Sequence, residues 1–555
     1  MERRRGEQMK GGRGSGPASR RALLSALLVA LSLLATGLVS APSADAAERP
    51  NIVLIQVDDA VTGDLRFMPK IRRQLIQRGT RFTRFFNSYP LCCPARTTLL
   101  TGQFAHNHRV LSNFQANDGG YYTFSSLPGE LNQSNSLGPW MQAAGYRTAL
   151  VGKYLNEYGA LDRREVPPGW DRWAALLDNS TYDYFNYAMN IDGKVRFWGD
   201  RDYARQQLKL ATLGATDPAE SFAELLALFR EAFVPFDSFG SARPRDYSMD
   251  TNGRIAARFV SEAAPSKRPF FLYYAPPAPH AEDTNHIQGL RPGAPEPDPR
   301  PPYRYRDEYD DAHAPRSAAF NESDVSDKAA NIRDLPKLTR EQIDEIDDNY
   351  RGRLGALRSV DDQVGLILRR LRRAGELRNT YIVFNSDNGY IQGEHRLRGS
   401  KFLPFESSIR VPTVIRGPGV RGGRKIGGNA IDVDLAPTIL DIAGAKPGRT
   451  MDGLSLLDAV RKGRRLPRRD VPLEALRPLF RFFTPLTAFD VPYYAVRAAR
   501  FKYVRWSFGE SELYDLKRDP HELENLAGDP AYADVVARLE ARASELQECA
   551  GSSCR

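Results

Sequence analysis

The stretch Cys92-Cys93-Pro94-Ala95-Arg96-Thr97-Thr98-Leu99-Leu100-Thr101-Gly102 brings two of the chain's four cysteines together, ahead of a proline and an arginine. Pro94 suits the first turn of a helix, so the pattern predicts a helix that begins near Cys92. Backbone N–H groups and the positive end of the helix dipole would then face Cys92, with Arg96 one turn further on. Such a helix start favours an anion.

Polar residues follow four predicted buried strands. The strands are expected at 51–57, 146–151, 269–274 and 380–385, and the polar residues after them are Asp58 and Asp59, Lys153, His280, and Asp387 and Asn388. Ligands of open α/β sheets collect at the carboxyl ends of the strands. Carboxylate and amide oxygens suit Ca²⁺ or Mg²⁺, whereas zinc would favour histidine or cysteine ligands.

The motif at Cys92 resembles the signature of the type I sulfatases, C-x-P-S/A-R followed at fixed spacing by L-T-G. The resemblance covers roughly residues 49–530. It implies that a formylglycine-generating enzyme oxidises Cys92 to formylglycine (3-oxoalanine), with Cys93 at the variable second position. It also implies an α/β fold: an alkaline-phosphatase-like sandwich with a large mixed sheet between helices, plus a small C-terminal α+β subdomain.

The same resemblance assigns roles to the strand-end residues. It implies a Ca²⁺ site, with Mg²⁺ as the alternative, formed by Asp58, Asp59, Asp387, Asn388 and an oxygen of modified Cys92. It implies a catalytic set of Cys92, Arg96, Lys153, His280 and Lys401. A hydroxyl of the hydrated aldehyde would attack sulfur, and His280 or Lys401 would give a proton to the leaving oxygen.

Two further stretches resemble the N-acetylglucosamine-6-sulfatase branch, namely 152–159 (Gly-Lys-Tyr-Leu-Asn-Glu-Tyr-Gly) and 106–108 (His-Asn-His). Many sulfatases place a histidine two or three residues after the lysine, and this chain has Leu155 and Asn156 there. Asn156 is expected to contact substrate. His106 and His395 are expected to line the substrate pocket, with a purely structural role as the equal alternative.

The N-terminus predicts export. Basic residues up to Arg21 precede an apolar run from Ala22 to about Val39, and the small residues at 44–46 offer a cleavage site. Residues 1–46 are therefore interpreted as a signal peptide, of Sec or twin-arginine type. An uncleaved membrane anchor is the alternative, because the run is close to the minimal length of a span.

Beyond the leader, residues 47–465 are predicted to be the sulfatase catalytic domain and 466–555 a C-terminal subdomain with an antiparallel sheet and a terminal helix. Cys549 and Cys554 could form a small disulfide in an exported protein. Residues 160–250 show little periodicity and are interpreted as an insertion that shapes the pocket. Asn252 and Ser359 are predicted helix caps.

The predicted function is hydrolysis of sulfate monoesters by a secreted bacterial enzyme, with 6-O-sulfated N-acetylglucosamine in glycans as the expected substrate. A small sulfate ester is the other substrate considered. Without the leader, whose seven basic and three acidic residues give it +4, the net charge of +10 falls to about +6, and this modest positive excess suits an anionic substrate. No nucleic acid partner and no stable membrane association are expected. The alternatives are an arylsulfatase, a phosphomonoester or phosphonate hydrolase on the same scaffold, and a non-catalytic sulfated-glycan-binding protein in which Cys92 is never oxidised.

Overall fold

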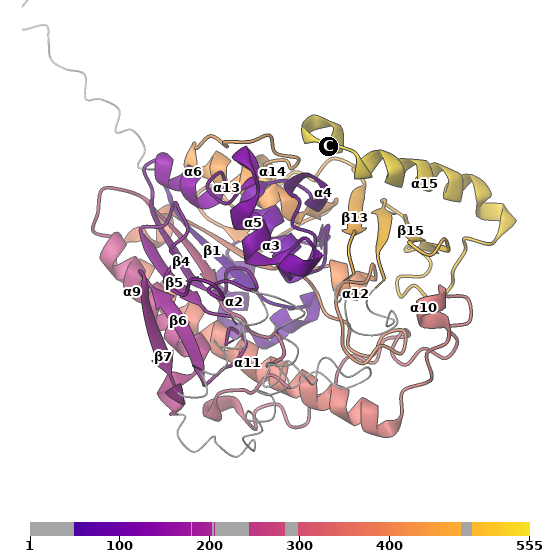
Figure 1. The fold of residues 1–555 in the computed structure, drawn as a ribbon, viewed down its shortest axis with the longest axis horizontal. Coiled ribbons are helices and arrows are strands. Elements are labelled where there is room, and N and C mark those ends of the chain that lie inside the picture. The colour runs from indigo at the N-terminus through magenta and orange to yellow at the C-terminus, as the bar shows by residue number, and fades with distance from the viewer. Residues whose placement is uncertain (1–48, 179, 202–204, 206–242, 283–297, 479–490) are drawn as a thin grey trace, which may run out of the picture. The chain divides into compact units, whose positions relative to one another are not determined.

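The computed structural model describes residues 49–178, 180–201, 205, 243–282, 298–478 and 491–555 (Figure 1). The predicted signal peptide lies outside these residues. From Arg49 onward the described chain forms one compact unit. No helix within it combines the length and the apolar character needed to cross a bilayer.

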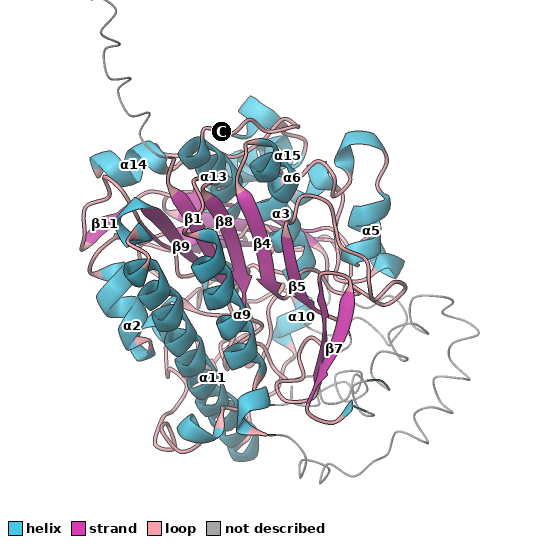
Figure 2. Ribbon diagram, turned by 90° about the vertical axis from the view of Figure 1, so that its left-hand side faces the viewer, coloured by secondary structure: helices cyan, strands magenta, loops and turns pink. Residues whose placement is uncertain are grey.

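A ten-stranded sheet runs through the centre of this unit (Figure 2). In spatial order its strands are β11 (Arg424–Ile426), β2 (Thr80–Phe82), β10 (Val414–Arg416), β9 (Thr380–Ser386), β1 (Asn51–Val57), β8 (Phe270–Ala275), β4 (Arg147–Gly152), β5 (Arg172–Leu176), β6 (Tyr187–Ile191) and β7 (Lys194–Trp198). The central strands β9, β1, β8, β4 and β5 are parallel. Because β10, β6 and β7 pair antiparallel with their neighbours, the sheet is mixed, as predicted.

Helices cover both faces of this sheet (Figure 2). In β1, Ile52 and Leu54 belong to a core with the helices of one face, whereas Val53 and Ile55 belong to a core with those of the other. The first face carries α3 (Cys92–Thr101), α5 (Gly120–Ser126), α6 (Leu137–Ala143) and α13 (Leu435–Ala443); the second carries α9 (Ser248–Ala263) and α11 (Arg340–Arg373). A strand buried on both faces needs apolar residues throughout, which explains the continuous apolar run of β1.

A second, antiparallel sheet lies in the C-terminal region, as predicted. It consists of β13 (Val471–Ala475), β14 (Tyr493–Arg497), β15 (Phe501–Trp506) and β16 (Ser511–Asp515), and α15 (Ala533–Gln547) packs on it (Figure 1). Its core also includes Leu397 and Phe405, which come from the chain before residue 465. The two predicted domains therefore share packed side chains.

The remaining elements are short. They are α2 (Pro69–Ile71), continued by a π-helical turn (Arg72–Ile76), α4 (Ala105–His108), α10 (Ala330–Arg333), α12 (Glu406–Ile409), α14 (Leu457–Lys462), and a two-stranded sheet of β3 (Phe85–Phe86) and β12 (Ala430–Ile431). The terminal helix is preceded by a 3₁₀ turn, and the side chain of Asp529 caps that turn by accepting from the N–H of Ala531.

Two sequence predictions, both of helix caps, were wrong. Asn252 lies inside α9, which begins at Ser248, and Ser359 lies in the middle of the single helix α11. Asn and Ser favour caps wherever they occur, but here both side chains are buried where packing continues the helix. The stretch 160–250, interpreted as an insertion with little periodicity, contains β5, β6 and β7.

Candidate active site

The predicted strand-end residues meet at one edge of the ten-stranded sheet. The last residue of β1, Val57, pairs with Ser386 at the end of β9, and Gly152 of β4 pairs with Ala275 at the end of β8. Asp58 and Asp387 therefore follow neighbouring strands, as do Lys153 and the loop that leads to His280. The prediction that these distant segments converge is confirmed.

Cys92 is the first residue of α3 and is buried. Its Sγ lies 3.7 Å from Oδ1 of Asp58 and 3.2 Å from Nζ of Lys401. The next backbone N–H, that of Cys93, donates to Oδ1 of Asn113 at 2.9 Å. The sulfur of Cys92 thus sits between a carboxylate and an ammonium group at the positive end of a helix.

Three cationic side chains bind the carboxylates around Cys92. Nε of Arg96 lies 2.8 Å from Oδ2 of Asp387, and its other guanidinium end lies 3.2 Å from Asp58. Nζ of Lys153 lies 2.5 Å from Asp58, and Nζ of Lys401 lies 2.6 Å from Asp59. These contacts bring the predicted catalytic cations and the predicted metal ligands into one cluster.

Burial and mutual charge shift the pKa values of these groups. Burial alone would raise the pKa of Asp58, but nearby cations, Lys153 foremost, hold it well below its ordinary value. Burial would lower the pKa of Lys401, but the carboxylate of Asp59 raises it well above its ordinary value. For Asp387, burial and the charge of Asp58 raise the pKa. The cluster is therefore held together by strong attraction between opposite charges.

His280 lies at the edge of the same cluster. Its Nε2 is 3.8 Å from Oδ2 of Asp59, and its side chain is 16% exposed. Burial and Lys401 lower the pKa of His280, but Asp59 and Asp58 outweigh them and raise it to about 9. Lys401 is also partly exposed, at 11%, whereas Cys92 and Arg96 are covered. A substrate would therefore approach past Lys401 and His280.

Two buried oxygens in this region have no hydrogen-bond partner among the described residues: Oδ2 of Asp59 and Oδ1 of Asn388. An unpaired buried oxygen is costly unless something else binds it. Asp59 also adopts φ of +71°, a left-handed conformation that is uncommon for a residue other than glycine and clusters at functional sites. Oxygen donors left open in this way fit a hard divalent cation.

We refer to Asp58, Asp59, Cys92 and His280 as the catalytic cluster. One ligand atom of each lies within 4.8 Å of the others. Asp387 and Asn388 adjoin it, because Oδ1 of Asp387 accepts from the N–H of Asp59 and the amide of Asn388 donates to the Asp59 carboxylate.

Two features that position the site were not predicted from the sequence. Gly152 has φ of +115°, and a Cβ there would lie 2.1 Å from the carbonyl oxygen of Ala275, so only glycine allows β4 to approach β8 before Lys153. Arg353, buried in α11, donates to the carbonyls of Asp59 and Pro279. An arginine inside a long helix carries no sequence signal for this role.

Asn156 is close to the site but does not contact the catalytic cluster directly. Its N–H donates to Sγ of Cys93 at 3.1 Å, and its Nδ2 donates to the hydroxyl of Tyr182 at 3.0 Å. Tyr182 was missed because it lies in the stretch 160–250. The contacts of Asn156 place it behind the catalytic cluster, which does not support the predicted contact with substrate.

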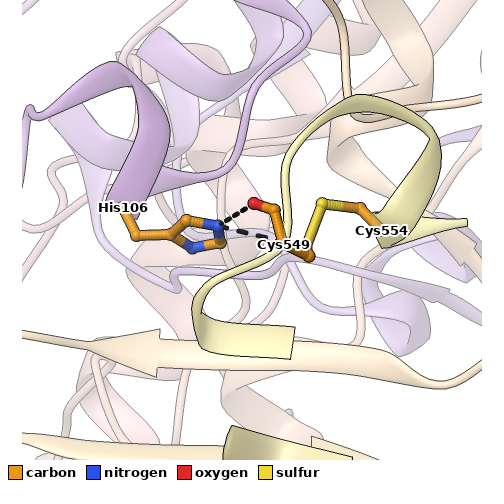
Figure 3. Close-up of side chains that lie close together, drawn as sticks. All are labelled: His106, Cys549 and Cys554. Carbon is orange, nitrogen blue, oxygen red and sulfur yellow. Dashed lines mark hydrogen bonds between the residues drawn. A yellow bond between two sulfur atoms is a disulfide. The ribbon is translucent and has the colours of Figure 1, made fainter. Parts of the chain in front are cut away.

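The structure does not bring His106 or His395 to the catalytic cluster. Nδ1 of His395 bonds Oε2 of Glu322 at 2.6 Å, and its ring stacks on Phe405 in the core under the C-terminal sheet. His106 bonds the carboxylate of Glu474 through Nδ1, and its other ring nitrogen lies 2.8 Å from the carbonyl of Cys549 (Figure 3). The contacts of both histidines therefore support a structural role and not a place in the wall of the substrate pocket.

The predicted disulfide between Cys549 and Cys554 is present. With His106 these two cysteines form a second group that we call the tail cluster (Figure 3). Its sulfurs are bonded to each other, so they offer no thiolate to a metal ion. This cluster ties the C-terminal tail to α4.

Comparison with known proteins identifies the family. The model of the family described as Sulfatase matches residues 50–445, and that of the N-sulphoglucosamine sulphohydrolase C-terminal region matches residues 393–549. A putative extracellular sulfatase Sulf-1 homolog of Caenorhabditis elegans is 32% identical over 74% of this chain and 49% of its own length. The N-acetylglucosamine-6-sulfatase of Capra hircus is 30% identical over 92% of this chain and 86% of its own length.

The fold agrees with this result. A solved structure of a protein in complex with its substrate D-glucosamine-2-N,6-O-disulfate superposes with a TM-score of 0.66. It is 22% identical and covers 90% of this chain and 98% of that one. The predicted alkaline-phosphatase-like α/β sandwich is therefore confirmed. Together with the converging cations and carboxylates around Cys92, these matches show that the chain belongs to the sulfatase family of sulfuric ester hydrolases and is similar to the N-acetylglucosamine-6-sulfatases.

Proposed function

We propose that this protein is an exported bacterial sulfatase that removes the 6-O-sulfate of N-acetylglucosamine in glycans, with Cys92 as formylglycine and Ca²⁺ as its metal. The observation that carries the proposal is the environment of Cys92. Its side chain is buried between Asp58 and Lys401, and further cations lie behind those carboxylates. The three cations gathered around it, Arg96, Lys153 and Lys401, would bind the singly charged sulfate group of a monoester.

The residues present fit a divalent metal. Asp58, Asp59, Asp387 and Asn388 would hold it through oxygen atoms, two of which lack any other partner among the described residues. Such a set favours Ca²⁺ or Mg²⁺ over zinc. When bound, the ion would supply positive charge that lowers the pKa of a coordinated hydroxyl and polarises the ester.

Modification of Cys92 requires a maturation enzyme that transfers two electrons from Cβ of Cys92 to an external oxidant, while the sulfur leaves as sulfide. The hydrated aldehyde would supply the nucleophilic hydroxyl for attack on sulfur. Lys401, which is 3.2 Å from Sγ, is placed to bind a sulfate oxygen at that position. Lys153 and Arg96 stabilise the charge that develops as the ester bond breaks, because they are already desolvated and aimed at the cluster.

His280 is the group we assign to proton transfer. As the S–O bond to the sugar breaks, the leaving oxygen needs a proton, and the partly exposed side chain of His280 lies at the edge of the site with Nε2 turned towards Asp59. Lys401 keeps its charge, because nearby carboxylates raise its pKa well above its ordinary value. This division gives the exposed imidazole the acid role and the ammonium group the binding role.

The substrate and the location are inferred from relatives and from the leader. The Capra hircus relative is named for 6-O-sulfated N-acetylglucosamine, and it matches most of this chain. Export is supported by the basic and apolar leader and by the extracellular naming of the Caenorhabditis elegans relative.

The decisive experiment combines mass and turnover. The tryptic peptide Phe85–Arg96 of the protein secreted by its natural host should have lost one sulfur and two hydrogens and gained one oxygen. The same preparation should release inorganic sulfate from 6-O-sulfated N-acetylglucosamine, and the Cys92→Ala variant should not. An intact thiol would refute the mechanism and favour the binding role. Faster turnover of a matched phosphate ester would refute the sulfatase assignment, and turnover of 4-nitrophenyl sulfate alone would refute the glycan substrate.

A further inference from the structure

We propose that Tyr182 is a positioning residue that holds the imidazole of His280 in the plane needed to protonate the leaving oxygen. The inference rests on the proposed function, because it concerns the acid step of that reaction. Tyr182 lies between β5 and β6, in the part of the chain where the sequence carried no prediction of individual residues.

The first argument concerns what fixes the ring of His280. Its Nδ1 lies 2.7 Å from the carbonyl oxygen of Ala281, and because a carbonyl only accepts, Nδ1 carries a proton and donates it. Nε2 is then the nitrogen that faces Asp59. Contacts at the nitrogens lie on the edge of the ring, so a contact on its face is needed to fix its plane.

Tyr182 supplies that contact. The two rings stack with centroids 4.0 Å apart and an interplanar angle of 20°. Nζ of Lys153 also lies 4.7 Å from the centroid of Tyr182, within the range of a cation–π contact. The tyrosine ring therefore touches two of the side chains that surround the reacting group.

Tyr182 is itself held in place. Its side chain is buried, and its hydroxyl accepts from Nδ2 of Asn156, whose own backbone N–H donates to Sγ of Cys93. A continuous set of contacts thus joins the residue after Cys92 to the ring of His280. A ring fixed at its far end can impose an orientation on the ring that stacks on it.

The neighbouring tyrosine has a different role. The hydroxyl of Tyr184 donates to the carbonyl oxygen of His280 at 2.7 Å, so it fixes the backbone and not the ring. The loop around Tyr182 and Tyr184 thus contacts His280 twice. Loss of the Tyr182 ring should change the ring plane while the backbone of His280 stays where it is.

The chemical consequence depends on the leaving group. When the S–O bond breaks, a sugar alkoxide takes the proton from Nε2–H of His280, and the imidazolium becomes neutral. A 4-nitrophenolate leaves without that proton, because it is a weak base. An effect on His280 alone should therefore slow the sugar sulfate and spare the aryl sulfate.

The experiment compares Tyr182→Leu with Tyr182→Phe on 6-O-sulfated N-acetylglucosamine and on 4-nitrophenyl sulfate. We expect the leucine variant to lower kcat for the sugar sulfate by about 10²-fold, the range of general acid catalysis, and kcat for the aryl sulfate by less than about threefold. The phenylalanine variant keeps the stacked ring, so it should restore most of the sugar-sulfate turnover.

Equal losses on both substrates, or a phenylalanine variant as slow as the leucine variant, would overturn the inference. A crystal structure of the leucine variant gives an answer that does not depend on turnover: a displaced His280 ring supports the role, and an unchanged ring plane refutes it. If the protein without any substitution released no sulfate from either ester, the proposed function would fail. The crystal structure of the leucine variant would still decide what Tyr182 does to His280.

Discussion

The catalytic cluster and the tail cluster are built from similar residue types, yet only one of them has the features of a reactive site. Both bring cysteine and histidine together, and His106 of the tail cluster follows Cys92 by only fourteen positions. In the tail cluster every ligand atom is already engaged: the sulfurs are bonded to each other, and both nitrogens of His106 have partners. In the catalytic cluster, by contrast, Oδ2 of Asp59 is buried without a hydrogen-bond partner among the described residues.

The difference shows that residue type is a weaker guide to function than unused bonding capacity. A buried cation or carboxylate is costly unless an opposite charge or a ligand compensates it. The catalytic cluster concentrates several such groups around one side chain, and the tail cluster shares its groups among structural contacts. Substitutions in the catalytic cluster should therefore mainly lower activity, whereas substitutions in the tail cluster should mainly lower stability.

The largest effect is expected for Cys92→Ala. Removing the nucleophile should lower kcat for sulfate release by at least about 10⁴-fold, because losing a nucleophile costs an enzyme most of its rate enhancement. The variant should keep its thermal unfolding temperature within a few degrees, because alanine retains Cβ and Cys92 is not a member of the hydrophobic cores of the described residues. Initial rates of sulfate release and a thermal melt measure both quantities.

The control in the other cluster is the double variant Cys549→Ser with Cys554→Ser, which removes both sulfur atoms of the tail cluster. It should keep kcat within about threefold, since neither cysteine belongs to the catalytic cluster and only contacts that strengthen in the transition state lower the barrier. If both variants lost activity equally, the two clusters would not differ as the contacts indicate.

Metal binding should give the next largest effect. At a Ca²⁺ concentration of 100 times Kd, binding stabilises the folded protein by about 2.7 kcal/mol, and a tenfold loss of affinity reduces the gain to about 1.4 kcal/mol. Asp59→Asn, which removes the charge beside the unpaired oxygen, should show at least this loss. Thermal unfolding with Ca²⁺ and with a chelator measures the gain.

His106→Gln is the control for this experiment, because it changes the other cluster. It should keep the full gain with Ca²⁺. A Ca²⁺ response that was lost in His106→Gln and kept in Asp59→Asn would place the metal in the tail cluster and contradict the assignment.

The sequence predicted the centre of the fold better than its periphery. The strand at 51–57 was predicted with its observed bounds, because a parallel strand covered on both faces must be apolar throughout. The strands between 172 and 198 were missed, because they lie in the stretch 160–250, which was interpreted as a whole as an insertion with little periodicity. Ser359 was predicted as a cap because local preference cannot see that α11 continues through it.

The residues of the site also fall into a group that could be predicted from the sequence and a group that could not. Cys92, Asp58 and Lys153 follow strands or begin a helix within recognisable motifs, so their convergence could be predicted. Tyr182 and Arg353 act through a stacked ring and two backbone carbonyls. Such contacts depend on where elements far apart in the sequence come together, and no spacing rule encodes that.

The disulfide of the tail cluster should contribute to the stability of the protein and not to its activity. Its cysteines are separated by 5 positions, and closing so short a loop restricts the unfolded chain by about 2 kcal/mol in the chain-entropy description. The double serine variant should therefore unfold more easily by up to about 2 kcal/mol in urea. An unchanged free energy of unfolding would mean that the tail contributes no stability through this bond.

The smallest effect concerns pH and His106. Burial lowers the pKa of this histidine, but its bond to Glu474 and the charge of that carboxylate outweigh burial and raise the pKa above its ordinary value of about 6.5. A raised pKa in the folded state stabilises the protein fully below pH of about 6.5, and the contribution disappears as the pH rises through the folded-state pKa. His106→Gln should thus lose about 1 kcal/mol of unfolding free energy at pH 6 and less at pH 9. Urea unfolding at the two pH values measures the difference; a loss that grew towards pH 9 would mean that the ring is neutral in the folded protein and that Glu474 does not hold it as a cation.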